Sequence, residues 1–290
     1  MIVAVCVCCA CACTDPGTPA APRLSPSPPA APAPAEQPAP GDQKITLDFG
    51  GKPRTYVVHA PPTYDGHAAL PLVVGLHYSN GDAAAIATMS GLNAKADTDN
   101  VLVVYPEGYQ REYNALNCCG GEDDVGFVKT VVARMVSLWR ADPRRIFAVG
   151  MSNGGEMAFR IAVELPATFA AIAVVSGGFI GPKTVEQSYR PATPVSVITF
   201  LGGRDRRYFA FNAGIERWQQ QLACVPIGTA SLAKGITVST DICSDVSNLV
   251  VYRLPHMYHS WPGAREGELA DPDAGVDATD LVWEFFRAHG

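Results

Sequence analysis

The chain has 290 residues, of which 48% are hydrophobic and 17% are charged, which suits one globular domain with a large apolar core. The net charge of −6 is spread along the chain without a basic cluster, which argues against nucleic acid or an anionic membrane surface as a partner. No apolar run reaches the roughly 18 residues of an ordinary membrane span.

The first stretch, residues 1–13, is apolar and holds five of the nine cysteines. Cysteines this dense can bind a metal, but no histidine or acid stands among them and the other residues are aliphatic. We therefore expect the apolar core of an export signal. Cys13, which precedes a polar stretch, is a candidate for lipidation in a cell-envelope lipoprotein, and Cys11 is a second candidate. Such a lipid is the one membrane contact that we expect.

Residues 14–43 are dominated by Pro and Ala. A segment of this composition cannot bury a core and prefers extended conformations. We expect a disordered tether that joins the export segment to a catalytic domain over residues 44–290.

In that domain, apolar stretches alternate with helical patterns. Residues 44–49 and 54–59 flank Gly50-Gly51 and predict an antiparallel hairpin. Further strands are expected at 72–77, 101–105, 145–149, 170–176, 195–201 and 249–254, and helices at 83–89, 92–97, 123–140, 156–165, 210–222 and 279–288, the third of them capped by Asp123 or Asp124. Buried strands alternating with helices predict an α/β fold, with a doubly wound, mostly parallel sheet between two helical layers.

The most informative stretch, residues 146–157, reads I-F-A-V-G-M-S-N-G-G-E-M. An apolar strand, then G-x-S-x-G, then a helix is the pattern of a nucleophile elbow, with Ser152 as the nucleophile. A Cβ atom at Gly150 or Gly154 is expected to collide with the neighbouring strand or helix. The first free N–H groups of the new helix would face a developing anion.

A serine hydroxyl needs a base, and the base needs an orienting acid; in this fold they follow in the order serine, acid, histidine. Two histidines lie in the loop after the strand 249–254. We favour His259, because the Trp-Pro-Gly turn that follows can hold its ring, over His256. The favoured acid is Asp205, at the carboxyl end of the strand 195–201. Asp241 and Asp245 are weaker candidates.

An oxyanion hole needs two backbone N–H donors. Asn153 is expected to supply one. The second is expected from the loop after the early strand, from Tyr78 or Ser79, and the residues do not decide between them. We assign no proton transfer to His77, which organises that loop. We also predict that Tyr113 and Trp261 contact the substrate.

With these candidate catalytic residues assigned, the chain resembles the LpqC/polyhydroxybutyrate-depolymerase-type esterases, a family that includes secreted feruloyl and acetylxylan esterases. The resemblance runs from about residue 45 to the C-terminus. It is carried by L-V-V-G-L-H in the region 71–77, V-Y-P-E-G at 104–108, Y-N-A-L-N-C-C-G-G-E-D-D-V-G-F at 113–127, D-P-R-R-I-F-A-V-G-M-S-N-G-G at 142–155 and H-S-W-P-G at 259–263. It implies an α/β-hydrolase fold with Ser152 as nucleophile, Asp205 as acid and His259 as base.

The chain departs from the family pattern at several positions. His77-Tyr78 stands where His-Gly is usual, so a side chain is expected to crowd the oxyanion loop. Tyr113-Asn114 stands where Trp-Asn is usual, and Leu201-Gly202-Gly203 replaces a strand end in His-Gly. Arg206-Arg207 replaces a Pro/Val pattern. We expect these departures to affect which ester is accepted as substrate more than the type of reaction.

Four cysteines fall in the catalytic domain, and four allow three pairings. Export favours oxidation, and our hypothesis is a Cys224–Cys243 disulfide. Cys118 and Cys119 either form a vicinal disulfide or remain thiols. The domain has no metal-ligand spacing and no G-x-G-x-x-G after a strand, so no metal or other cofactor is implied.

The resulting hypothesis is an exported, monomeric serine esterase that hydrolyses carboxylic esters through an acyl-enzyme. Because the chain ends soon after His259, leaving no room for an added binding domain, we expect soluble short-chain, acetyl or feruloyl esters rather than crystalline polyester. The alternatives are a serine peptidase on the same fold and an inactive cell-envelope binding protein.

Overall fold

The computed structural model describes residues 2–5 and 36–290. The chain divides into two units, Met1–Ala35 and Glu36–Gly290. Residues 2–5 of the first unit are exposed and belong to no helix or strand. The rest of the predicted export segment, including Cys11 and Cys13, and residues 14–35 of the predicted tether lie outside the described residues. Within the two described ranges, no helix has the length and apolarity needed to cross a bilayer.

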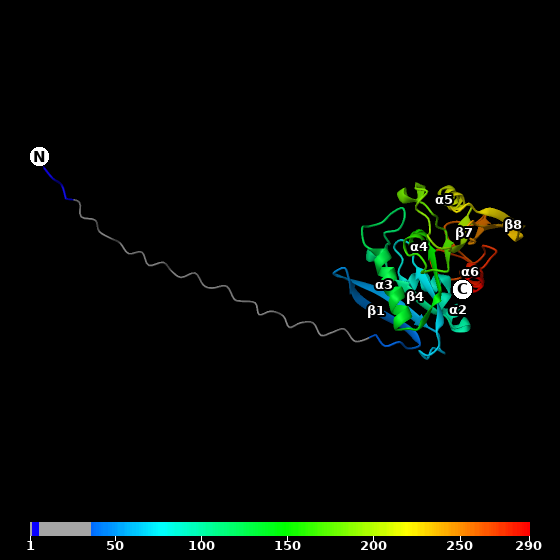
Figure 1. Cartoon of the computed structure of the whole chain (residues 1–290), viewed down its shortest axis with the longest axis horizontal. Helices are drawn as coiled ribbons and strands as arrows, with labels where there is room; N and C mark the ends of the chain where they lie inside the picture. Colours follow the sequence, from blue (N-terminus) through cyan, green and yellow to red (C-terminus); the bar gives the residue numbers. More distant parts are fainter. Residues whose placement is uncertain (1, 6–35) are drawn as a thin grey trace. The chain divides into compact units, whose positions relative to one another are not determined.

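The second unit is built on one ten-stranded sheet, in the order β1-β2-β4-β3-β5-β6-β7-β10-β9-β8 (Figure 1). Its strands are β1 (Gly41–Phe49), β2 (Lys52–Ala60), β3 (Leu70–Leu76), β4 (Leu102–Pro106), β5 (Ala141–Met151), β6 (Ala171–Val175), β7 (Ser196–Gly202), β8 (Val225–Ser231), β9 (Thr237–Ile242) and β10 (Asn248–Leu254). The six strands from β4 to β10 in this order are parallel. They read as continuous apolar runs because both of their faces are covered.

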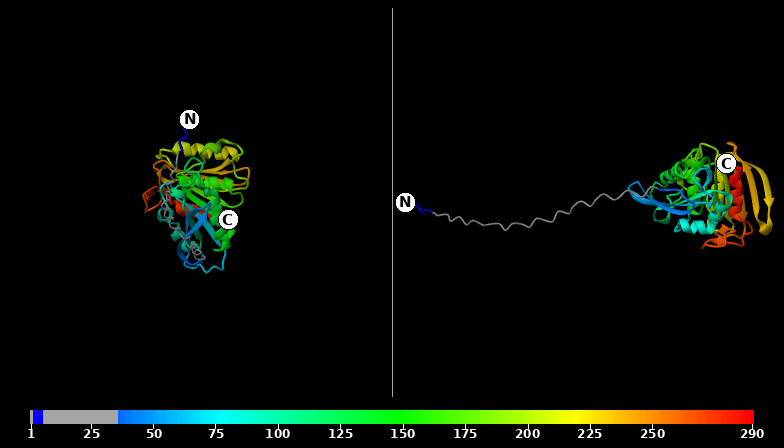
Figure 2. Two further views of the ribbon diagram at one scale, coloured as in Figure 1. Left: turned by 90° about the vertical axis from the view of Figure 1, so that its left-hand side faces the viewer. Right: turned by 90° about the horizontal axis from the view of Figure 1, so that it is seen from below.

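Helices cover both faces of the sheet (Figure 2). On one face α3 (Asp124–Ser137), α4 (Asn153–Glu164) and α5 (Tyr208–Gln221) contribute to one apolar core. On the other face α1 (Ala83–Ser90), α2 (Leu92–Asp99) and α6 (Ala278–Ala288) contribute to a second. Short 3-10 turns at Tyr109–Arg111, Pro182–Val185 and Ala233–Gly235 and a small sheet of β11 (Trp261–Pro262) and β12 (Ala270–Asp271) complete the described elements. The predicted α/β fold is confirmed.

Antiparallel strands flank the parallel centre on both sides. The predicted hairpin forms one edge, where β1 pairs with β2 and β2 with β4. The other edge, β9 and β8, was not predicted as part of the sheet. Every residue of β8 is exposed, so burial imposes no alternating pattern that could mark it in the sequence. Near this edge a disulfide joins Cys224, just after α5, to Cys243, just after β9, with sulfurs 1.98 Å apart.

The folded unit begins earlier than the predicted boundary at residue 44, which is a correction. The Glu36 carboxylate accepts hydrogen bonds from the Tyr56 hydroxyl at 2.8 Å, from Arg134 Nε at 3.0 Å and from the Trp139 indole. The β1 strand then starts at Gly41. Because Glu36 lies between Pro-Ala stretches, composition assigns it to the tether, and only its partners on β2 and around α3 place it in the domain.

Candidate active site

Ser152 lies in the sharp turn between β5 and α4, with φ 55° and ψ −117°. A non-glycine residue at positive φ is uncommon, and such conformations concentrate at functional sites. The glycines on either side allow the turn. A Cβ atom on Gly150 would lie 2.1 Å from the Gly154 carbonyl oxygen, and one on Gly154 would lie 2.2 Å from the Leu76 carbonyl oxygen. The turn therefore has the tight packing that the G-x-S-x-G pattern predicted.

The Ser152 hydroxyl is not used to hold the helix that it precedes. Ser152 is the N-cap of α4, yet its side chain makes no capping hydrogen bond, although serine commonly caps in this way. Its backbone is held by the bond from Ser152 N to Val175 O, 3.0 Å long, at the end of β6. The hydroxyl, on a half-buried residue, thus stands beside the unpaired N–H groups of the first turn of α4.

His259 and Asp205 meet at the same edge of the sheet. Asp205 follows β7, His259 follows β10, and their Oδ2 and Nδ1 atoms are 2.6 Å apart. The loops approach closely because Gly202 carries no side chain, since a Cβ there would lie 2.4 Å from the Tyr258 carbonyl oxygen. The alternative histidine, His256, is exposed in the same loop. The bond to Asp205 requires a proton on Nδ1, which leaves Nε2 as the acceptor.

The Asp205 carboxylate is buried and ionised. Burial acts to raise its pKa, but the His259 ring and the backbone N–H of Arg207, 2.8 Å from Oδ1, together hold the pKa of Asp205 below its ordinary value. Among the described residues, no arginine side chain forms a salt bridge with Asp205, whose ionic partner is His259. The Arg207 side chain turns instead to Glu156, 2.8 Å away. Burial raises the pKa of Glu156 to about 7 against the influence of that arginine.

Ser152 and His259 belong to neighbouring segments of this edge, but the described contacts include no hydrogen bond between their side chains. Two contacts join the segments. Ser152 N donates to Val175 O, and the hydroxyl of the next residue, Ser176, donates to Ser260 O at 3.0 Å. The turn at Ser152 and the loop of His259 are thus both attached to the end of β6. Hydrogen bonds between catalytic groups are often long before substrate binds.

The loop after β3 is organised by His77, as predicted. Its Nε2 accepts from Gly108 N at 2.9 Å and its Nδ1 donates to Tyr78 O at 2.8 Å, so the ring is neutral with the proton on Nδ1. Burial lowers the pKa of His77 to about 4. This loop touches the elbow, since the Cβ that Gly154 lacks would also lie 2.5 Å from His77 O.

Tyr78 does not crowd the loop as expected, because its side chain turns into the apolar core and is only 6% exposed. Burial, with a hydrogen bond to Glu268, raises the pKa of Tyr78 to about 12. The Tyr78 ring thus contributes to packing, and the backbone that touches the elbow is that of Leu76 and His77, directly before Tyr78. Whether Tyr78 or Ser79 donates to an oxyanion stays open.

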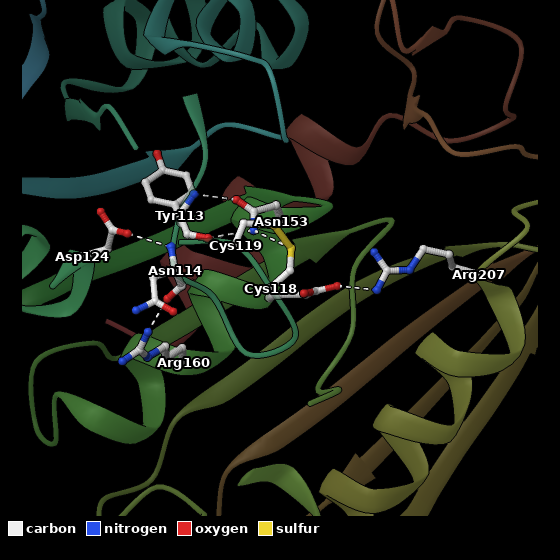
Figure 3. Close-up of a disulfide and its surroundings, with 9 residues drawn as sticks. Tyr113, Asn114, Cys118, Cys119, Asp124, Asn153, Arg160 and Arg207 are labelled. Carbon is white, nitrogen blue, oxygen red and sulfur yellow. Dashed lines mark hydrogen bonds and ion pairs between the residues drawn. A yellow bond between two sulfur atoms is a disulfide. The ribbon is translucent and has the colours of Figure 1, made fainter. Parts of the chain in front are cut away.

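The side chain of Asn153, next to Ser152, holds the long loop between β4 and α3 (Figure 3). Its Oδ1 accepts from Tyr113 N at 2.8 Å, and its Nδ2 donates to Tyr113 O at 3.0 Å. Nδ2 also lies 3.8 Å from the sulfur of Cys118, which is joined to Cys119 in a vicinal disulfide. From the sequence only the backbone N–H of Asn153 is expected to have a role, and the clamp that its side chain forms is visible only in the structure.

Two predicted substrate contacts need correction. Tyr113 is fully buried, with its ring centroid 4.6 Å from that of His77 and its hydroxyl bonded to Pro106 O. Trp261 is also fully buried, and its indole N–H donates to Thr279 Oγ1 at 3.1 Å. Both side chains therefore support loops and face away from solvent. Aromatic residues beside catalytic motifs suggest a binding role, and sequence cannot show that their rings turn inward.

A doubly wound sheet with a serine elbow after its fifth strand defines the α/β-hydrolase fold, the fold of esterases and other serine hydrolases. Among solved structures, an acetyl xylan esterase from Aspergillus awamori superimposes with a TM-score of 0.60 at 19% identity, covering 85% of this chain and 99% of that one. Residues 54–189 match the family model described as esterase PHB depolymerase.

Two curated relatives show how far the similarity in sequence extends. The putative esterase NocK of Nocardia uniformis subsp. tsuyamanensis is 36% identical over 164 residues, 53% of this chain and 46% of that protein. A probable feruloyl esterase C of Aspergillus clavatus is 28% identical over 250 residues, 81% of this chain and 84% of that protein. The chain thus spans about half the length of NocK and most of the length of the feruloyl esterase.

Proposed function

We propose that this protein is a serine esterase that hydrolyses carboxylic esters through an acyl-enzyme. Ser152 attacks the ester carbonyl as His259 takes its proton at Nε2, and Asp205 stabilises the imidazolium that forms. Asn153 N–H and the N–H of Tyr78 or Ser79 hold the oxyanion. His259 then protonates the leaving alcohol, and water, deprotonated by the same ring, releases the acid.

The observation that carries this proposal is the 2.6 Å bond between His259 Nδ1 and Asp205 Oδ2. It fixes the ring nitrogen facing the acid as a donor and therefore leaves the other nitrogen as a base. This pair lies on loops attached to the same strand ends as a serine in the strained conformation of a nucleophile elbow.

The test compares Ser152→Ala and His259→Ala with His256→Ala as the matched control, because His256 is an exposed histidine three residues away in the same loop. Hydrolysis of p-nitrophenyl acetate should fall by several orders of magnitude for the first two variants and stay near wild type for the third. A fluorophosphonate probe should label the wild type at Ser152. Full turnover by Ser152→Ala, or loss of turnover in His256→Ala alone, would contradict the assignment. An unlabelled, inactive wild type would favour a binding protein.

For the substrate we propose acetyl or feruloyl esters of soluble alcohols, supported by the feruloyl and acetyl xylan esterases among the similar proteins. The assay is a panel of p-nitrophenyl acyl chains, methyl ferulate, acetylated xylan and hydroxybutyrate oligomers. Preferential turnover of the hydroxybutyrate oligomers would reject this choice while leaving the esterase mechanism intact.

We further propose that the protein is exported. Two disulfides, Cys118–Cys119 and Cys224–Cys243, suit an oxidising compartment. The lipid anchor is proposed at Cys13 from the sequence pattern alone. Metabolic labelling with palmitate, compared between the wild type and Cys13→Ser, tests the anchor, and fractionation of cells that express both tests export itself.

A further inference from the structure

Glu156 is a buried carboxyl group beside the proposed active site to which the mechanism gives no role. It lies in the first turn of α4, four residues after Ser152, and none of its surface is exposed. Its Oε1 accepts from Arg207 Nη2 at 2.8 Å, and its Oε2 has no hydrogen-bond partner among the described residues. A buried carboxylate is costly unless it is paired, so its presence under the nucleophile turn calls for a function.

Arg207 connects this carboxyl to the proposed triad acid. Its guanidinium bonds Glu156, while its backbone N–H donates to Asp205 Oδ1 at 2.8 Å. The guanidinium also lies over the Phe211 ring, 4.9 Å from its centroid. Figure 3 shows Arg207 with its dashed contact, reaching from the start of α5 toward the Cys118 loop. One residue therefore fixes the acid loop by its main chain and the nucleophile helix by its side chain.

We propose that Glu156 is a positioning residue. By holding Arg207 it fixes the loop that carries Asp205, and so keeps Asp205 and His259 in position relative to helix α4, which follows Ser152. The proposal rests on the proposed function. The geometry gives a continuous path from Glu156 through Arg207 to Asp205 Oδ1, and from Asp205 Oδ2 to His259. Both carboxylate oxygens of Asp205 are thus used, one by the base and the other by the loop that Glu156 holds.

The strength of this link depends on the charge of Glu156. The charged and polar groups that face it are Arg207 from the acid loop, His259 from the base loop and the Asn117 N–H from the Cys118 loop, and each favours the ionised carboxylate. Burial opposes them and raises the pKa of Glu156 to about 7. Because a charge-assisted hydrogen bond is stronger than a neutral one, the link should tighten as pH rises through that value.

The experiment compares kcat/KM for p-nitrophenyl acetate between the wild type and Glu156→Gln across pH. The amide keeps a bond to Arg207 but cannot ionise. At about pH 5.5, where wild-type Glu156 is protonated, the two enzymes should differ less than about twofold; at about pH 8.5 the wild type should be about tenfold faster, mostly in kcat. A merely structural loss would give the same ratio at every pH.

Glu164→Gln is the matched control, because Glu164 lies on the same helix and pairs with Arg160 and Lys183 rather than with the acid loop. The ratio of kcat/KM between the wild type and Glu164→Gln should not change with pH. Arg207→Gln should match the loss of Glu156→Gln at high pH, and the double variant should be no worse than either single one. Because the Arg207 side chain is 38% exposed, this variant carries the test if Glu156→Gln does not fold.

A constant wild-type-to-variant ratio across pH, or additive losses in the double variant, would overturn the positioning role. A failure of the positioning role can be distinguished from a failure of the proposed function. If Ser152→Ala stays active, the esterase mechanism fails whatever Glu156 does; if Ser152→Ala is inactive while the Glu156→Gln ratio is flat, only the positioning role fails.

Discussion

The clamp between Asn153 and Tyr113 should contribute measurably to stability. Asn153→Ala removes two buried hydrogen bonds and leaves the N–H group of the fully buried Tyr113 without a partner, while Tyr113 O keeps the bond from Ala115 N at 2.8 Å. The unpaired N–H group costs about 1–3 kcal/mol, and the second lost hydrogen bond about 1 kcal/mol more. We expect the free energy of unfolding to fall by about 3 kcal/mol, and the melting temperature of a domain this large by about 6–12 °C.

Asn153→Asp sharpens this test. The ionised carboxylate still accepts from Tyr113 N but has no proton for Tyr113 O, which then faces a second acceptor. Protonation of the aspartate restores a donor. The variant should therefore be less stable than the wild type at neutral pH and should recover much of the difference as pH falls through the titration of that carboxyl.

The assay is urea unfolding followed by tryptophan fluorescence, since Trp139 and Trp218 are buried in the core. Loss of the clamp should also lower kcat, because the loop beside the nucleophile turn is released. If the free energy of unfolding of Asn153→Ala lies within about 0.5 kcal/mol of that of the wild type, the two hydrogen bonds contribute no net stability, which would refute the stabilising role of the clamp. An Asn153→Asp variant whose deficit is independent of pH would refute the donor–acceptor assignment.

Three further predictions concern other parts of the site and its scaffold. Because the pKa of buried His77 is about 4 and that of an unfolded histidine about 6.5, the unfolded chain binds the proton first, and the contribution of His77 to the free energy of unfolding should fall by about 3 kcal/mol as pH drops between these values. The raised pKa of Glu156 acts in the opposite direction, so the check is the difference between the wild type and His77→Gln in urea titrations at several pH values, which should change by this amount. Replacing Cys224 and Cys243 by serine opens a loop of 19 residues and should cost about 3 kcal/mol of stability by thermal unfolding, with turnover retained. In Gly154→Ala, the new Cβ would lie 2.2 Å from Leu76 O, so fluorophosphonate labelling should slow by at least about 100-fold even in folded protein.

The sequence predicts the parts of this fold whose conformation follows from local chemistry. The apolar runs at the centre of the sheet are strands because both faces are buried, and Gly150 and Gly154 mark the elbow because no side chain fits there. Helix α3 starts at Asp124 with Asp123 as its cap, a choice between neighbouring aspartates that only the bond from Gly126 N decides.

Features that depend on distant partners could not be predicted in this way. Glu36 belongs to the domain only because Tyr56, Arg134 and Trp139 converge on it. Trp261 looked like a binding aromatic, yet its ring is enclosed in the core. In each case the deciding neighbour lies tens of residues away, and a single sequence carries no record of that contact.

The departures from the family pattern become intelligible once their surroundings are known. Tyr78, where glycine is usual, places its ring in the apolar core, and Tyr113, where tryptophan is usual, places its ring on His77. Arg207, in a Pro/Val position, meets the carboxyl of Glu156. Tyr113 and Arg207 contact groups that hold the loops around Ser152 and Asp205, Tyr78 contributes to the core, and none of the three replaces the proposed serine, acid or histidine. We therefore expect these differences to alter how firmly the loops are held. Compared with its relatives, this chain should differ in its reaction rates and their pH dependence rather than in the type of reaction.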